Sequence, residues 1–188
     1  MPEGHIWESG SEKDVNGIEF NPNMPTEEIF CLPHKYGVNG TLASTKPLVY
    51  GGNVINDFVL KFEKGRIVDF TAKEGEETLK HLIETDEGSH YLGEIALVPY
   101  SSPISDTNTV FYNTLYDENA SCHFAIGSAY SSCIEGGNDI KAEDFDKYGI
   151  NDSLTHVDFM VGSADLDIVG ITHDGEKIQI FKDGNWAF

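Results

Sequence analysis

Basic residues are scarce in this sequence, which has 12 Lys and Arg residues against 32 Asp and Glu, and Arg66 is its single arginine. The formal net charge of -20 would repel a phosphate backbone, so binding to nucleic acids or to anionic membranes is disfavoured. No apolar run approaches the roughly 20 residues that a membrane-spanning helix needs. The first residues lack the basic and apolar regions of a secretory signal. These absences favour a soluble, cytoplasmic protein.

Disulfide-forming and familiar catalytic patterns are also missing. The three cysteines are an odd number without Cys-x-x-Cys spacing, which argues against a disulfide framework or a structural zinc knuckle and favours reduced thiols. There is no His-Glu-x-x-His, Gly-x-Ser-x-Gly, Gly-x-x-x-x-Gly-Lys-Ser/Thr or Gly-x-Gly-x-x-Gly motif. The sequence therefore lacks the motifs that are typical of single-zinc proteases of that type, α/β-hydrolases, P-loop enzymes and dinucleotide-binding enzymes.

Apolar residues that alternate along the chain predict several strands. A hairpin is expected from 57–62 and 66–70 around a Lys64-Gly65 turn, with the apolar side chains of its first arm on one buried face. The other apolar runs bounded by turn residues predict strands at 92–98, 109–112, 157–161, 167–171 and 177–181. The last two are joined by a short turn and form a second hairpin.

Two helices are predicted. Apolar residues at helical spacing among charges indicate one at 74–84. A second begins at Asp117 or Asn119, either of which can cap it, and ends at Cys133 or Ile134 before a pair of glycines.

These elements define the expected fold class. Residues 2–25 indicate loops joined by an irregular strand. Hydrophobic residues make up 39% of the 188 positions, and neither a repeat nor a linker interrupts them. We expect one α+β domain over residues 1–188, with a sizeable mixed or antiparallel sheet and a few helices.

His156 and Asp158 stand two apart in a predicted strand, so both side chains point to the same face, while Val157 points to the other. A neutral imidazole and a carboxylate suit zinc, cobalt or manganese, whereas calcium prefers more oxygen ligands. A structural hydrogen bond between the two side chains is the alternative.

His123 and Tyr130 are seven apart in the predicted second helix, so they would share one face and line one cleft. Glu118, at the start of that helix, is either a first-turn acid favoured by the helix dipole or a ligand. Cys122 lies next to His123, but helical neighbours point about 100° apart, which argues against a thiol nucleophile activated by this histidine.

Glu94 interrupts a strand that is otherwise suited to complete burial. A buried carboxylate is costly unless it is paired, protonated or bound to a cation. Glu27 and Glu28 follow Thr26, which would cap a short helix that has both acids in its first turn. Their positions alone do not show which of these two glutamates would be a metal ligand.

The same segments resemble the M29 family of metalloaminopeptidases. The resemblance covers essentially the whole chain and rests on residues 23–28, Leu-Pro-His-Lys at 32–35 with Val-Asn-Gly at 38–40, Leu-Gly-Glu-Ile-Ala-Leu-Val-Pro at 92–99, residues 113–123, His-Val-Asp-Phe-Met at 156–160 and Gly-Asn-Trp-Ala at 184–187.

The resemblance implies a set of site residues. The family's metal-ligand positions fall on Glu28, Glu94, Glu118, His123, His156 and Asp158. Tyr130 falls on its catalytic tyrosine, where it would hydrogen-bond the oxyanion, and Glu28 or Glu94 would move the proton of the attacking water. Glu27 is the fallback for Glu28.

The resemblance also implies an activity and an organisation. The expected enzyme removes N-terminal amino acids from peptides that have a free N-terminus, and it uses two divalent metal ions (Zn, Co, Mn or Mg) to activate a water molecule. Family members look like two-domain proteins, and this chain resembles their C-terminal, metal-binding half, with the N-terminal domain absent. The full-length protein is expected to form a homodimer.

Two other functions fit parts of the sequence. A non-catalytic, acidic, β-rich binding or assembly domain would use the same carboxylates in solvent or to hold one structural cation. A two-metal phosphoesterase would use a similar site, but it usually needs a cation such as arginine to bind the phosphate. The scarcity of arginine in this sequence, which has only Arg66, disfavours this function.

Overall fold

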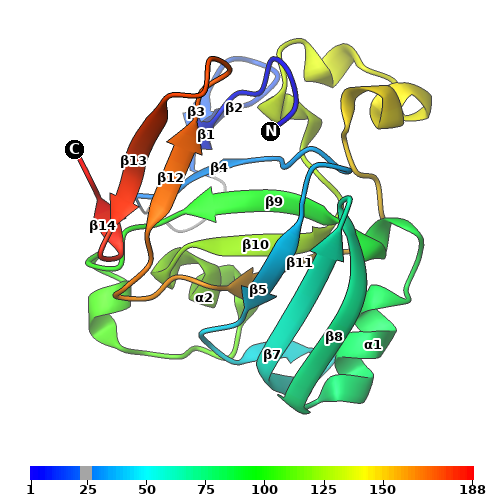
Figure 1. The fold of residues 1–188 in the computed structure, drawn as a ribbon. Coiled ribbons are helices and arrows are strands. Elements are labelled where there is room, and N and C mark those ends of the chain that lie inside the picture. The colour runs from blue at the N-terminus through cyan, green and yellow to red at the C-terminus, as the bar shows by residue number, and fades with distance from the viewer. Residues whose placement is uncertain (22–26) are drawn as a thin grey trace.

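The computed structural model describes residues 1–21 and 27–188, and it shows an α+β fold, as predicted (Figure 1). The largest sheet is five-stranded, and each pair of neighbours in it is antiparallel. Its strands, in spatial order, are β1 (Glu8–Ser9), β4 (Ile29–Cys31), β9 (Leu92–Leu97), β10 (His123–Gly127) and β11 (His156–Met160).

A long hairpin with one helix covers one side of this sheet (Figure 1). Strands β7 (Asn53–Glu63) and β8 (Arg66–Glu74) pair around the predicted turn, where Lys64 and Gly65 both have positive φ. β5 (Gly40–Ala43) and β6 (Leu48–Tyr50) pair with β7, and α1 (Glu76–Ile83) follows β8. The predicted hairpin and first helix are therefore confirmed.

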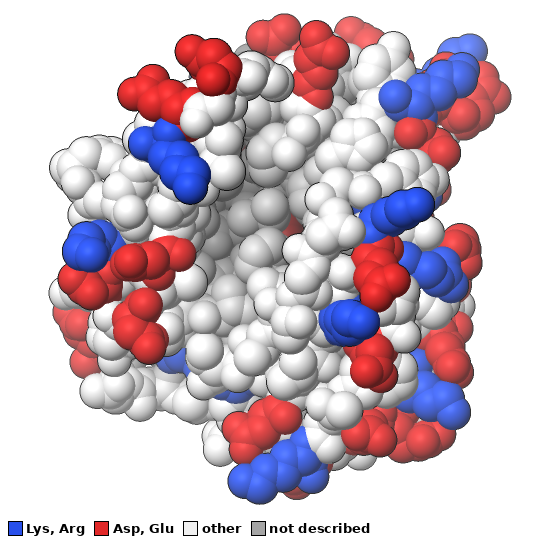
Figure 2. Space-filling model, in the orientation of Figure 1, with Lys and Arg blue, Asp and Glu red and all other residues white. Residues whose placement is uncertain are grey.

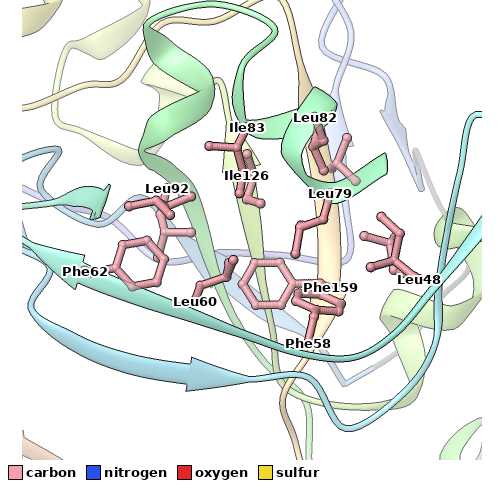
Figure 3. Packing of buried hydrophobic residues seen from close by; sticks show 13 residues of the cluster. Leu48, Phe58, Leu60, Phe62, Leu79, Leu82, Ile83, Leu92, Ile126 and Phe159 are labelled. Atoms are coloured by element: carbon pink, nitrogen blue, oxygen red, sulfur yellow. The ribbon is translucent and has the colours of Figure 1, made fainter. Parts of the chain in front are cut away.

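The main core lies between the hairpin, α1 and the central sheet (Figure 3). Phe58 of β7 lies 5.5 Å from Phe159 of β11 between ring centroids, and both are at most 1% exposed. The other buried members include Leu60, Phe62, Leu79, Leu82, Leu92 and Ile126. Because this core occupies one face of β9, β10 and β11, the opposite face is left for other chemistry.

The C-terminal residues form a separate three-stranded sheet, at the upper left of Figure 1. It consists of β12 (Ile168–Ile171), β13 (Lys177–Lys182) and β14 (Asn185–Trp186), and the β12–β13 pair is the second predicted hairpin. β2 (Glu12–Lys13) and β3 (Glu19–Phe20) form a further pair.

The remaining helical elements are short. They are α2 (Thr114–Asp117) and the 3-10 turns η1 (Gly88–His90), η2 (Ser105–Thr107), η3 (Glu118–Ala120), η4 (Ser131–Cys133), η5 (Gly137–Asp139) and η6 (Ala142–Tyr148). Among the described residues, no helix is long and apolar enough to cross a membrane.

The predicted second helix is wrong. The chain forms α2 and η3 and then enters β10, so the segment from Asp117 or Asn119 to Cys133 or Ile134 is mostly strand and loop. Alternate residues of β10 pack into the core, and this period of two overrides the local helical signals.

The strand predicted at 109–112 is also wrong. The backbone N–H groups of Phe111 and Asn113 donate to the carboxylate of Asp117, at 2.8 and 3.0 Å, instead of to a neighbouring strand. Tyr112 has a φ of 55°, which extended strands do not allow. The cap predicted at Thr26 lies outside the described residues.

Figure 2 shows where the charged side chains lie on one face of the molecule. Acidic and basic side chains lie mainly around the edge of this face, and its hollowed middle is largely uncharged.

Candidate metal centre

The face of the central sheet that is turned away from the main core holds four polar side chains. His123 of β10, His156 and Asp158 of β11, and Glu94 of β9 all lie on this face, while in β10 and β11 the intervening residues contribute to the core. In the strand register Glu94 lies opposite Ala125, and Ala125 lies opposite Asp158. A small alanine therefore separates two carboxylates across the sheet and leaves space between them.

These side chains converge into two groups of three, Glu28 with Glu94 and His123, and Glu94 with His156 and Asp158. Within each group, one ligand atom from each residue lies within 4.8 Å of the others. Nε2 of His123 is 3.4 Å from Oε1 of Glu94, and Nε2 of His156 is 3.6 Å from its Oε2. The carboxylate of Glu94 thus directs one oxygen toward each group.

Glu28 and Asp158 are the third members of the two groups. Oε1 of Glu28, in the segment before β4, is 3.7 Å from Nε2 of His123. Oδ1 of Asp158 is 3.5 Å from Nε2 of His156. Glu27, the fallback for Glu28, is exposed and belongs to neither group, so the geometry favours Glu28.

Glu118 and Tyr130 lie beside the two groups. Both line a cavity of about 320 Å³ together with Glu28, Glu94 and Asp158. Glu118 comes from η3 and belongs to neither group of three. The Tyr130 ring centroid is 5.1 Å from that of His156, and the residue follows β10 in a loop. His123 and Tyr130 were predicted to line one cleft from one helix face. Tyr130 lines the cavity from a loop, whereas His123, on strand β10, is buried and is not among the residues that line it.

Two backbone carbonyls that sequence reasoning missed orient the histidines. Nδ1 of His123 is 3.0 Å from the carbonyl oxygen of Ser121, and Nδ1 of His156 is 2.7 Å from that of Ser128. A carbonyl only accepts hydrogen bonds, so each Nδ1 carries the proton and each Nε2 faces the carboxylates. This arrangement is typical of histidines that bind a metal through Nε2. No side-chain pattern signals it, because every residue has a carbonyl.

A register shift in the sheet brings the Ser128 carbonyl close to β9. The pairing of β9 with β10 shifts between Ala125 and Ile126, next to Gly93. A Cβ atom on Gly93 would lie 2.1 Å from the Ser128 oxygen, which only a glycine avoids. Such irregularities often redirect a side chain at a functional site.

Crowded carboxylates perturb the titration of the buried groups. Burial raises the pKa of Glu118 to about 8, and the negative charge of Asp158 adds to the effect. Burial would lower the pKa of His123, but its contact with Glu94 and the charges of Asp158 and Glu28 raise it to about 10. The pKa of His156 rises to about 9 because its contact with Asp158 and the charge of Glu94 outweigh burial.

The pKa values of Glu28 and Asp158 are shifted in opposite directions. Burial raises the pKa of Glu28, although the positive charge of His123 opposes the rise. Burial would also raise the pKa of Asp158, but attraction to His156 and His123 holds it below its usual value.

The donor set fits divalent cations. It combines two imidazole nitrogens with several carboxylate oxygens, and the buried Oδ1 of Asp158 has no hydrogen-bond partner among the residues that the structure describes. A cation at each group would satisfy that oxygen and offset the repulsion between the carboxylates.

Comparisons with known proteins also point to a metal-dependent protein. A profile of the family described as "Thermophilic metalloprotease (M29)" matches residues 1–186. The chain is 58% identical over 188 residues to "Aminopeptidase 2" of Geobacillus stearothermophilus and 60% identical over 188 residues to "Aminopeptidase AmpS" of Bacillus subtilis, covering 46% of each relative. It superimposes on the solved structure "Wild-type AmpT from Thermus thermophilus" with a TM-score of 0.92 at 43% identity, covering 100% of this chain and 46% of that one. The chain therefore spans about half the length of the relatives it matches.

The metal-free protein is predicted to lose stability as the pH rises. Glu118, His123 and His156 have folded-state pKa values of about 8, 10 and 9 against ordinary values of 4.5, 6.5 and 6.5. The folded state therefore binds more protons than the unfolded state within these windows, and its free energy of unfolding falls as the pH rises through them. Urea unfolding of chelator-treated protein between about pH 5 and pH 9 measures this slope.

Glu118→Gln serves as the control for that slope. It removes one titrating group, so the part of the slope between about pH 4.5 and 8 should become smaller. A free energy of unfolding that rises across the same range would contradict the assignment of these shifts.

Proposed function

Because this chain belongs to the thermophilic metalloprotease (M29) family, whose relatives named above are aminopeptidases, we propose that it is the metal-binding part of a two-metal aminopeptidase. The observation that supports the number of metals is the pair of three-residue groups that share Glu94. A carboxylate that offers one oxygen to each of two groups is suited to bridge two cations.

The proposed ligands are the residues that the sequence predicted, Glu28, Glu94, Glu118, His123, His156 and Asp158. Glu118 would join the Asp158 side of the site, since its carboxyl interacts with Asp158 across the cavity. Bound divalent cations would lower the pKa of a shared water and bind the free amine of a peptide.

Glu28 is the favoured proton carrier in this proposal. Its side chain is 16% exposed where that of Glu94 is 7%, so Glu28 is the more accessible from the cavity. Burial raises its pKa, which makes its carboxylate a better acceptor for a proton from water, and it would then pass this proton to the leaving amine. Glu94, whose two oxygens face the two histidines, is the alternative carrier.

Tyr130 would hydrogen-bond the oxyanion as the peptide carbonyl is attacked. Burial and the nearby carboxylate of Glu94 raise its pKa to about 12, so the phenol keeps its proton and remains a donor at neutral pH. The ring also packs edge-on against Phe30, with centroids 6.0 Å apart, which restrains its position in the cavity wall.

The cavity is suited to a ligand that bears an ammonium group. Besides the proposed ligands, its lining includes Glu8 and Glu12, and it includes neither lysine nor arginine among the residues that the structure describes. This favours a peptide with a free N-terminus over a phosphate ester, since phosphate binding usually requires a cation from the protein.

The finer properties of the proposed enzyme rest on the resemblance in sequence. We propose that the metals come from Zn, Co, Mn and Mg, and that the full-length protein is a cytoplasmic homodimer that acts on peptides. The rival proposal, an acidic binding or assembly domain that holds one structural cation, predicts a different metal content.

Metal analysis separates the two proposals. After saturation with zinc and gel filtration, we expect about two zinc ions per chain, because two groups of ligands are present. His123→Ala and Asp158→Ala should each lower this content, whereas His81→Ala, which alters an exposed histidine of α1, should not. One tightly held calcium ion and no zinc would support the rival.

In the full-length protein, removal of the metals should abolish hydrolysis of aminoacyl substrates.

Tyr130→Phe tests the proposed oxyanion donor. We expect kcat of the full-length protein to fall about 100-fold or more, as for other single oxyanion donors, with unchanged metal content. Tyr148→Phe is the matched control, because Tyr148 is 49% exposed against 52% for Tyr130 and lies on η6 outside the cavity lining. Equal activity of the two variants would exclude the role proposed for Tyr130.

A further inference from the structure

The position of the His156 ring depends on one carbonyl group that lies beyond the end of a strand. Nδ1 of His156 donates to the Ser128 oxygen at 2.7 Å, and Ser128 follows Gly127, the last residue of β10. A carbonyl outside the regular ladder needs another constraint, because a small rotation of its peptide group would carry the imidazole with it.

Asn151 holds the backbone on both sides of Ser128. Its side-chain Nδ2 donates to the carbonyl of Gly127 at 2.6 Å, and its own backbone carbonyl accepts from the N–H of Ala129 at 2.9 Å. The N–H of Ser128 itself donates to the carbonyl of Thr155 at 2.7 Å. The peptide groups around the Ser128 carbonyl are therefore held by bonds to the segment that leads into β11.

Asn151 is itself firmly anchored. Its Nδ2 also donates to the carbonyl of Gly88 in η1 at 2.8 Å. The carboxylate of Asp86 accepts from the N–H of Leu154 at 2.6 Å and from the hydroxyl of Ser153 at 2.8 Å, which fixes the loop that follows Asn151. The constraint on His156 thus extends to η1.

The burial of Asn151 indicates why an amide is present at this position. The residue is 0% exposed, and within 1–21 and 27–188 its Oδ1 has no hydrogen-bond partner. An unsatisfied buried polar atom is costly, so packing is a poor reason for an asparagine at this place. A primary amide can donate to two carbonyls at once, whereas a hydroxyl can donate to one.

We propose that Asn151 is a positioning residue for the proposed metal centre, acting on His156 through the Ser128 carbonyl. The inference rests on the proposed function, since it assigns Asn151 to the group formed by Glu94, His156 and Asp158. The two groups share Glu94, but the orientation of the other histidine does not depend on Asn151, because His123 takes its orientation from the carbonyl of Ser121.

The test compares two histidines within one molecule. In zinc-loaded protein, the Nδ1–H protons of His123 and His156 are both expected as slowly exchanging, hydrogen-bonded signals in ¹⁵N NMR spectra. In Asn151→Ser, which removes one donor, the His156 signal should exchange faster and broaden while the His123 signal persists. A loss of general stability would affect both signals and would not produce this difference.

Zinc affinity is the second readout. Changes to groups that orient metal ligands typically weaken binding about 10- to 100-fold, so Asn151→Ser should weaken one of the two zinc sites to this extent. The affinity of the other site should fall by a clearly smaller factor. Asn185→Asp is the control variant, because Asn185 also bonds to backbone groups at both ends of its amide but lies in the C-terminal sheet.

A measurement on the unaltered protein covers the case in which the variants do not fold. The side-chain NH₂ resonances of Asn151 should shift as zinc fills the site that contains His156, and resonances of Asn185 should not. Unmoved Asn151 resonances, or equal weakening of both zinc sites in Asn151→Ser, would overturn the proposal. A protein that binds no zinc at all would instead refute the proposed function.

Discussion

The carboxylate of Glu94 is the interaction on which the site depends. It is buried in the central sheet, and its two oxygens face two different imidazoles at 3.4 and 3.6 Å. A charge in this position is stable only with positive partners, and the two histidines supply them when they are protonated. In the metal-free protein the contact with Glu94 raises the pKa of His123, and the charge of Glu94 adds to the larger effect of Asp158 on the pKa of His156. Divalent cations would meet the same requirement and release the protons, so the cost of burying Glu94 and the proposed affinity for metals have one physical origin.

The scaffold separates this charge from the hydrophobic core by using the two faces of one sheet. The core face of β9, β10 and β11 packs against the β7–β8 hairpin and α1 through residues such as Phe159, which gives the strands fixed positions (Figure 3). The opposite face presents the polar groups in register across Ala125. The histidine rings are then aimed by backbone carbonyls, one of which is held between bonds to Asn151. A rigid sheet with fixed carbonyls suits ligands that must keep their geometry to within a fraction of an ångström.

Local patterns predicted the placement of some candidate side chains for the right reason and of others for the wrong one. His156 and Asp158 lie on one face because the segment is a strand, as predicted. Glu94 is a buried carboxylate in a strand, as its apolar neighbours indicated. Tyr130 lines the cavity and His123 contacts Glu28 and Glu94, which also line it, but the helix that was expected to align them does not exist. The residues before β10 can cap a helix, and only packing of Phe124 and Ile126 against the core shows that the segment is extended.

The sequence by itself determined the class of chemistry: many carboxylates, few cations, a same-face histidine and aspartate, and motifs that resemble one family of metalloaminopeptidases. These are properties of residue types and of short-range periodicity, which the chain carries in any conformation. Only the tertiary structure decided that Glu28, Glu94, His123, His156 and Asp158 meet, since their approach depends on the pairing register of strands far apart in the chain. It also decided the roles of Ser121, Ser128 and Asn151, because they act through backbone carbonyls and a buried amide. Nothing in residue type marks such groups until the fold places them beside a ligand.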